Sequence, residues 1–473
     1  MKMYVGTDWI GADQSIEVLN PFDGSVVDTV PKATPVDVDR AIAAAARGAK
    51  TIADLTGYER SLILRRAGDL VLERVEELAS LITREEGKII GEARIEVNRA
   101  AEILYLSAEE AKRLNSEVVP LDGGPGVRGK FGFTLRVPCG VVAAISPFNF
   151  PLHLVCHKVG PALAGGNSVI VKPATDTPLS GLKLVEILLE AGIPPEAVQC
   201  LTGAGSDIGD MLVSDPRIRK ITFTGSRDVG EHITKTAGLK KVTMELGSNS
   251  PVIIMDDADM DKVTAALVQT TFANAGQVCI STQRIYADSE IYSDFVEAFG
   301  AKVSKINYGD PFDESVMMGP LVRSADAERV ANWIDQAVTD GAKVITGGNR
   351  DGGFVEATLL ADVDPAMRVS CEELFGPAAA VSRVRDLDQA IDLANDSPYG
   401  LSAAIFTQDI DRAMKFARKM DSGNIHINWG SQWRTDLMPY GGLKQSGMGK
   451  EGPRYAVRDM TEEKLVVMHL DDH

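Results

Sequence analysis

Short apolar strands alternate with amphipathic helices between residues 141 and 246, and this alternation restricts the fold more than any other feature of the chain. The strand-like segments are VVAAI, SVIVK, VQCLT, KITFT and KVTMEL, and a helical pattern separates each from the next. Strands joined in this way form an open parallel sheet with helices on both faces. The sequence therefore predicts an α/β fold, with ligands bound beyond the carboxyl ends of the strands.

The flanking segments predict three further parts. Residues 36–115 are helical in pattern, and a second α/β region begins near Gly247. The glycine-rich segment 120–140 predicts a hairpin that projects from the first region, and KLVVMHL near the C-terminus predicts a strand. These two peripheral segments could pair with each other or with another subunit.

Charge and cysteine usage exclude several classes of function. The chain has 49 basic and 67 acidic residues, a net charge of −18, which argues against a nucleic-acid partner. No apolar run reaches the ~18 residues that cross a bilayer, and MKMYVGTDWIGADQ lacks the apolar region of a signal peptide. The five cysteines are scattered without a CxxC pair, which argues against disulfides or a zinc site. We expect a soluble cytoplasmic protein with no membrane partner and no metal.

Cys279 is the first candidate for chemistry. It follows a predicted amphipathic helix, DKVTAALVQTTFA, that Gly276 is expected to stop, and it precedes the strand-like QRIYA. A cysteine held between a helix end and a strand is rigid yet reachable by substrate. A buried structural cysteine is the alternative interpretation of the segment by itself.

Glycines after two of the strands are candidates for phosphate binding. In KITFTGSRDVGEHI, Gly225 and Ser226 lie between a strand and a helix, whose N-terminal N–H groups suit a pyrophosphate. The cluster from Gly203 to Gly209 misses the GxGxxG spacing by one residue. An ordinary tight turn remains the alternative for both.

Two polar residues at strand ends complete the candidates. Asn149, in SPFNFP, could present its amide to an oxyanion, or it could be a turn residue before a proline. Glu245, at the end of KVTMEL, could be a general base whose pKa is raised by burial, or it could be one half of a salt bridge.

With these residues in place, the chain resembles the aldehyde dehydrogenase superfamily over nearly its whole length. The matching segments include SPFNFP, VIVKPA, MELGSNSP, FANAGQVC, EELFGP, MPYGGLKQSG and GKEGPRYAVRDMTEEKLVV, in family order between about 140 and 466. The chain is most similar to the lactaldehyde-dehydrogenase-like branch, with kinship to non-phosphorylating glyceraldehyde-3-phosphate dehydrogenases. The resemblance implies a nucleotide-binding domain (1–119 and 141–246), a catalytic domain (247–450), and an oligomerisation hairpin and strand (120–140 and 451–473).

The resemblance also implies roles for individual residues. Cys279 would be the nucleophile, Glu245 the general base and Asn149 an oxyanion donor, with Glu462 helping to relay protons. The implied cofactor-binding residues are Ile145, Pro147, Lys172, Thr175, Gly225, Ser226, Glu373 and Phe375. The candidate substrate-pocket residues are Phe150, Leu154, His157, Ile280, Ser281, Trp433 and Arg434.

The implied reaction is oxidation of a small aldehyde, hydroxylated or anionic, to its carboxylate. Many NAD-preferring members carry glutamate where this chain has Thr175, so we expect this chain to use both NAD and NADP. The resemblance also implies a homodimer or homotetramer. A CoA-acylating semialdehyde dehydrogenase is the nearest rival, although such enzymes generally lack a glutamate at the position of Glu245. A catalytically silent structural protein and a cofactor-independent thiol hydrolase are two further hypotheses.

Overall fold

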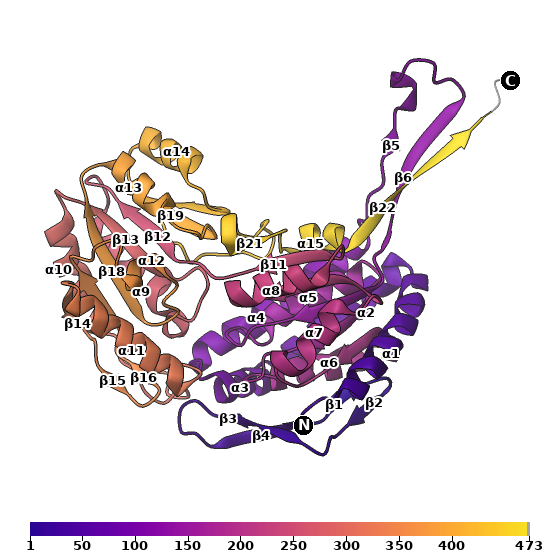
Figure 1. The fold of residues 1–473 in the computed structure, drawn as a ribbon, viewed down its shortest axis with the longest axis horizontal. Coiled ribbons are helices and arrows are strands. Elements are labelled where there is room, and N and C mark those ends of the chain that lie inside the picture. Colours follow the sequence, from indigo (N-terminus) through magenta and orange to yellow (C-terminus); the bar gives the residue numbers. More distant parts are fainter. Residues whose placement is uncertain (471–473) are drawn as a thin grey trace.

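Two large sheets, each covered by helices on both faces, dominate the computed structural model, which describes residues 1–470 (Figure 1). The last three residues of the expected C-terminal segment lie outside the described residues. The order of the first sheet is β2 (Asp8–Ile10), β1 (Met3–Val5), β9 (Val198–Cys200), β8 (Ser168–Lys172), β7 (Val141–Ile145), β10 (Ile218–Thr224), β11 (Lys241–Glu245) and β21 (Gly447–Met448). The five strands from β9 to β11 in this order are parallel, and β1 and β21 pair with them antiparallel.

The strands of this sheet are buried on both faces. In β8, Val169 and Val171 pack into one helix layer and Ile170 into the other, as the two-residue period of a strand requires. The first layer contains α2 (Gly57–Glu73), α3 (Val75–Glu86), α4 (Ile90–Ala111), α5 (His153–Ala164) and α6 (Leu179–Glu190). The second contains α1 (Pro35–Asp54), α7 (Gly205–Ser214) and α8 (Arg227–Ala237). The predicted α/β architecture is confirmed.

The second sheet is built in the same way. Its order is β14 (Lys343–Thr346), β17 (Thr358–Ala361), β18 (Ala378–Val384), β13 (Thr282–Asp288), β12 (Ser250–Ile254), β19 (Ser402–Phe406) and β20 (Asn424–Ile427). All neighbours are parallel except β14 with β17. The accompanying helices are α9 (Met260–Phe272), α10 (Tyr292–Val303), α11 (Ser324–Thr339), α12 (Arg368–Cys371), α13 (Leu387–Asn395) and α14 (Ile410–Lys419).

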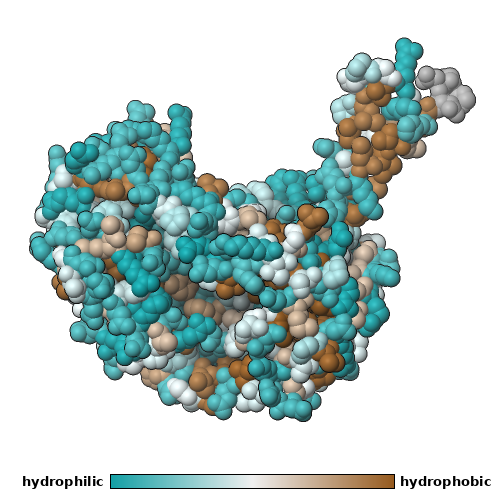
Figure 2. Space-filling view, in the orientation of Figure 1, coloured by the Kyte–Doolittle hydropathy of each residue, from teal (hydrophilic) through white to brown (hydrophobic). Residues whose placement is uncertain are grey.

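A three-stranded antiparallel sheet projects from the part of the molecule that contains the first large sheet (Figure 1). It consists of β5 (Val118–Val119), β6 (Lys130–Pro138) and β22 (Thr461–His469), and β22 follows α15 (Pro453–Asp459). Along β22 and β6, Thr461 pairs with Pro138 and His469 with Lys130, so the two peripheral segments pair with each other. Figure 2 shows apolar side chains over this projecting sheet, and its exposed members include Phe131, Leu135, Leu465, Val467 and Met468.

Several elements differ from the sequence prediction. The N-terminal hairpin β3 (Ser15–Leu19)–β4 (Val26–Pro31), the strands β1 and β2, and the small ribbon β15 (Arg350–Asp351)–β16 (Phe354–Val355) were not predicted. Short 3-10 turns are η1 (Leu121–Gly123), η2 (Pro195–Ala197), η3 (Ala273–Gly276) and η4 (Lys444–Ser446). The helix before Cys279 ends at Phe272 rather than at Gly276. Within residues 1–470, no helix is long and apolar enough to span a membrane.

Candidate active site

A cavity of about 960 Å³ lies between the two large sheets. The ends of β7, β8 and β10 and the first turns of α7 and α8 form one wall. Cys279, Glu373 and Phe375 contribute from the other side. The cavity therefore lies beyond the carboxyl ends of the parallel strands, where this architecture places its ligands.

The backbone before Cys279 has a left-handed conformation at three consecutive residues. Asn274, Ala275 and Gly276 have φ of 50°, 53° and 72°, a region that non-glycine residues rarely adopt. Glu92 accepts hydrogen bonds from the backbone N–H of Asn274, and Glu86 accepts one from its side-chain amide at 2.9 Å. A Cβ at Gly276 would lie 2.1 Å from the carbonyl oxygen of Gly376, so only glycine fits there. These contacts fix the backbone of the turn that leads to Cys279.

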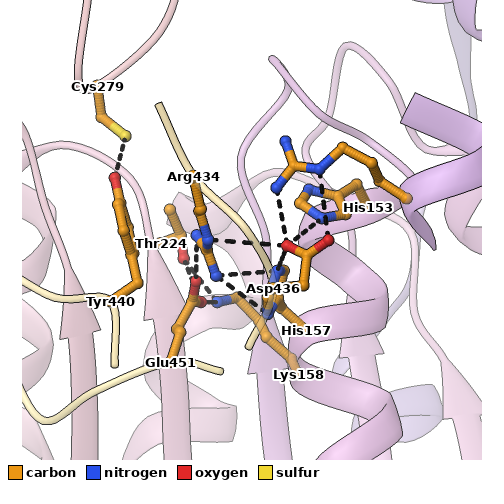
Figure 3. A network of polar contacts seen from close by, with 10 residues as sticks. His153, His157, Lys158, Thr224, Cys279, Arg434, Asp436, Tyr440 and Glu451 are labelled. Atoms are coloured by element: carbon orange, nitrogen blue, oxygen red, sulfur yellow. Dashed lines mark hydrogen bonds and ion pairs between the residues drawn. The ribbon is translucent and has the colours of Figure 1, made fainter. Parts of the chain in front are cut away.

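Cys279 is partly buried and lines the cavity. Its Sγ lies 3.2 Å from the hydroxyl of Tyr440 (Figure 3). Burial raises the pKa of the thiol to about 12; the Tyr440 hydrogen bond acts in the opposite direction, and the charge of Glu245 adds to the rise. Val278, Ile280 and Leu401 pack around it as a small apolar cluster with Phe150 and Met438 at its edge.

Asn149 lines the same cavity as Cys279. Its side-chain amide donates to the carbonyl of Gln277 at 2.7 Å, which leaves one of the two amide hydrogens for another acceptor. Its backbone carbonyl accepts from Lys88 at 2.7 Å. The amide is thus held in one orientation beside the cysteine loop.

Glu245 ends β11 and is buried, and neither carboxylate oxygen has a hydrogen-bond partner among the described residues. Burial, and then the charge of Glu451, raise the pKa of Glu245 well above its ordinary value. A carboxyl group in this state is poised to exchange a proton.

Glu451, rather than Glu462, is the second carboxylate near Glu245. Glu451 is buried, and Lys158 lies 3.0 Å from its Oε1. Burial acts to raise the pKa of Glu451, but the charges of Lys158 and Arg434 outweigh it and hold this pKa below its ordinary value. Glu462 lies instead on β22, where it is 3.4 Å from Lys241 and outside the lining of the cavity. Sequence reasoning missed Glu451 and Lys158, although a lysine within the otherwise apolar HLVCHKVGPALA is a signal for a buried charge.

The expected cofactor residues lie together along the cavity. Its lining includes Ile145, Pro147, Lys172, Thr175, Gly225, Ser226, Glu373 and Phe375. Burial lowers the pKa of Lys172 to about 8, and Ser226 is the residue before the first turn of α8. Glu373 accepts from the backbone N–H of Ser248 at 2.8 Å, and Phe375 meets Phe148 edge to face at 5.9 Å. A buried cation, a free helix N-terminus and a carboxylate fit the phosphates and riboses of a dinucleotide.

The expected substrate-pocket residues occupy different positions relative to the cavity. Leu154 lines the cavity and Trp433 is half exposed. Phe150 and Ile280 belong to the apolar cluster around Cys279, and Lys88 lies 3.9 Å from the Phe150 ring centroid. The Ser281 hydroxyl donates to the carbonyl of Thr271 at 2.9 Å, so it is engaged with α9 rather than free to bind substrate.

Arg434 and His157 belong to a buried polar network (Figure 3). The guanidinium of Arg434 is 3.1 Å from Glu451 and 2.9 Å from Nε2 of His157. Arg434 is therefore not a solvated loop residue, because only 8% of its side chain is exposed.

Asp436 joins this network to α4 and α5. It accepts from Arg99 at 2.7 Å, and His153 and His157 each lie 3.1 Å from the same oxygen. Burial lowers the pKa of His153 to about 3 and of His157 to about 4, with nearby arginines adding to the effect, so both rings are neutral. These three residues resemble a metal-ligand set in spacing, but two guanidinium groups already neutralise the carboxylate.

Nearly the whole chain matches a known family. The family described as "Aldehyde dehydrogenase family" matches residues 9–466, and the chain belongs to it. It is 47% identical to 3-sulfolactaldehyde dehydrogenase from Priestia aryabhattai, over 99% of this chain and 98% of the relative. It is 37% identical to lactaldehyde dehydrogenase from Methanococcus aeolicus, over 99% and 100% of the two chains. The crystal structure of NADP-dependent glyceraldehyde-3-phosphate dehydrogenase from Bacillus halodurans, complexed with NADP, has a TM-score of 0.97 at 37% identity and 99% coverage of both chains. The protein is an NAD(P)-dependent aldehyde dehydrogenase.

Proposed function

We propose that this enzyme oxidises a small hydroxy- or anion-bearing aldehyde to its carboxylate through a covalent thioester on Cys279. The observation that carries the proposal is the convergence of Cys279, the Asn149 amide and Glu373 on one cavity, with Glu245 buried beside it. These groups supply a nucleophile, an oxyanion donor, a cofactor anchor and a base.

The reaction begins at the sulfur. The Cys279 thiolate attacks the aldehyde carbon, and the free amide hydrogen of Asn149 stabilises the oxygen that becomes negative. Lys172, the α8 N-terminus and Glu373 would hold the dinucleotide, which would supply the hydride acceptor. Loss of hydride leaves a thioester on Cys279. Glu245 then takes a proton from water, and the hydroxide formed cleaves the thioester to release the acid and the thiolate.

Glu451 and Lys158 provide the route by which Glu245 loses its proton. The charge of Glu451 raises the pKa of Glu245, and the Lys158 ammonium lies 3.0 Å from Glu451 and 2.6 Å from the hydroxyl of Thr224. Thr224 lies at the end of β10, on the lining of the cavity. We therefore assign the proton-relay role, expected at Glu462, to Glu451.

An anionic substrate is supported by charge and by the relatives. The buried polar network contains three cationic side chains (Arg99, Lys158 and Arg434) and two carboxylates whose pKa is lowered (Asp436 and Glu451). It therefore has one positive charge in excess while Glu245 is protonated. The three relatives named above act on 2-hydroxy aldehydes, two of which carry a sulfonate or phosphate. Arg99 is 31% exposed and offers the accessible positive charge of the network.

A screen of purified protein tests the proposal. Lactaldehyde, 3-sulfolactaldehyde and glyceraldehyde 3-phosphate are compared with butanal and hexanal, using NAD and NADP in parallel. We expect kcat/KM for the anionic hydroxy aldehydes to exceed that for hexanal at least tenfold. Arg99→Met should raise KM mainly for the anionic substrates, whereas Arg94→Met, a matched change on α4, should not. Equal KM changes for neutral and anionic aldehydes in Arg99→Met would refute the charge argument.

The CoA-acylating alternative is disfavoured by the buried, high-pKa carboxyl of Glu245, which suits hydrolysis of the thioester. Product analysis with and without CoA separates the two activities.

We also propose the division of the chain into a nucleotide-binding domain (1–119 and 141–246), a catalytic domain (247–450) and a projecting sheet through which the protein forms a homodimer or homotetramer. Exposed apolar side chains on β6 and β22 support the last assignment.

A further inference from the structure

Tyr440 is the one hydrogen-bond partner of the Cys279 sulfur within residues 1–470, and the reaction steps above make no use of it. Its ring is buried, and its hydroxyl lies 3.2 Å from Sγ. Its backbone is fixed by two hydrogen bonds with Glu451, of 3.2 and 2.7 Å. The Tyr440 backbone is therefore held by the same residue whose charge raises the pKa of the base Glu245.

When Cys279 is a thiolate, the phenol is the donor in this contact, because a thiolate has no proton to give. Burial, and then the charge of a Cys279 thiolate, raise the pKa of Tyr440 well above its ordinary value, so the hydroxyl stays protonated. No other acceptor for this hydroxyl lies within hydrogen-bond distance in the described part of the chain. A neutral O–H beside a sulfur that alternates between thiol and thiolate stabilises the charged form selectively.

Arg434 lies over the face of the same ring. Its guanidinium carbon is 3.9 Å from the ring centroid of Tyr440, and its two ends are held by Glu451 and His157. A cation over the ring withdraws electron density from the phenol, which makes its hydroxyl a better donor. The stacked arrangement thus transmits the positive charge of Arg434 to the sulfur without direct contact.

Other charged groups around Cys279 and Tyr440 also shift the pKa of Cys279 or face the base Glu245. Glu245 and Glu373 raise the pKa of Cys279, and Arg434 lowers it. Lys158 and Lys450 face Glu245 from α5 and from the loop before α15. Only Tyr440 combines direct contact with the sulfur and a charge-selective effect.

We infer that Tyr440 is a further catalytic residue, which donates a hydrogen bond to the Cys279 thiolate, and that Arg434 is a positioning residue that holds and polarises the Tyr440 ring. The inference rests on the proposed role of Cys279 as nucleophile. It assigns Arg434 a role in activating the nucleophile in place of direct contact with the substrate.

The test is the pH dependence of Cys279 alkylation by iodoacetamide in the full-length protein. A Cys371→Ser background removes the exposed cysteine, and peptide mass spectrometry reports modification of Cys279 alone. Tyr440→Phe should raise the apparent pKa by about one unit, and slow alkylation at pH 8 about tenfold, because a hydrogen bond to the charged form is lost. Arg434→Lys, which keeps the charge but loses the planar stack, should give a smaller shift in the same direction.

Tyr308→Phe is the matched control, since Tyr308 packs against Phe354 at 5.2 Å; its alkylation profile should equal that of the parent. An unchanged or lowered apparent pKa in Tyr440→Phe, with an unchanged thermal unfolding midpoint, overturns the inference. The readout needs no turnover, so its failure is distinct from failure of the proposed function, which would appear as activity retained in Cys279→Ala.

Discussion

At the scale of single residues, we propose that position 175, on the lining of the cavity, contributes to the choice between NAD and NADP. The Thr175 hydroxyl donates to the carbonyl of Gly203 at 3.4 Å, and the adjacent Asp176 is paired with Arg323. Neither residue therefore presents a free carboxylate to a 2′-phosphate. We expect the parent to use both cofactors, with kcat/KM values within a thousandfold of each other, about 4 kcal/mol.

Thr175→Glu should lower kcat/KM for NADP at least tenfold relative to NAD, because a carboxylate repels a 2′-phosphate and accepts from a ribose hydroxyl. Thr175→Gln, which matches it in size without the charge, is the control. Steady-state kinetics with both cofactors decide the matter. An equal ratio in the Glu and Gln variants would place cofactor selection elsewhere in the cavity.

The proposed catalytic residues differ in how far sequence could predict them. Glu245 ends β11, and Asn149 and Cys279 lie in the loops that follow β7 and α9, so the local pattern indicates a strand end or a loop that faces a ligand. Glu451 becomes significant only because the fold brings it from a distant segment to Glu245 and Lys158. Its position cannot be inferred from spacing, and the family resemblance implies Glu462, in the same matching segment, for the relay role.

At the scale of elements, the junction of α3 and α4 supports the cysteine loop with a carboxyl group that is sensitive to pH. Burial raises the pKa of Glu86 to about 8 from its ordinary 4.5, and one of its oxygens has no partner in residues 1–470. Its protonated form contributes stability that is fully present below pH 4.5 and is lost progressively as pH rises from there through 8. Between pH 7 and 9 the loss should be on the order of 1 kcal/mol.

Glu86→Gln should remove this part of the pH dependence, since glutamine stays neutral and its carbonyl still accepts from Asn274. Urea unfolding of both proteins at pH 7 and 9 measures the effect. Glu77→Gln, a change at an exposed position of α3, is the control and should behave like the parent. A pH slope that is identical in Glu86→Gln and the parent would show that Glu86 is ionised throughout.

The regular elements of the first sheet were predictable because each is short, apolar and separated from the next by a clear helix. The strands β1 and β2 were not, since each has three residues and acquires its place by antiparallel pairing at a sheet edge. The left-handed turn at Asn274 and Ala275 was also beyond prediction. Alanine adopts positive φ only where tertiary contacts impose it, here through Glu86 and Glu92.

At the scale of the whole molecule, the projecting sheet should determine assembly. Leu465 and Val467 lie exposed on β22 amid other apolar side chains. Leu465→Lys combined with Val467→Lys should place charges in the proposed interface and shift the protein toward monomer, as measured by light scattering after size-exclusion chromatography. Leu239→Lys, at an exposed position after α8, is the control. An unchanged mass for the double variant would exclude this sheet as the interface.

The central claim, a thioester on Cys279 that Glu245 hydrolyses, is tested most directly by the mass of Glu245→Gln after reaction. Glutamine cannot take a proton from water, so the variant should release one equivalent of reduced cofactor rapidly and then turn over at least a hundredfold more slowly than the parent. Quenched protein should carry the acyl group of the aldehyde, and peptide mapping should place it on Cys279. Cys279→Ala in the same background should show neither burst nor adduct. A burst without an adduct, or an acyl group on another residue, would contradict the account.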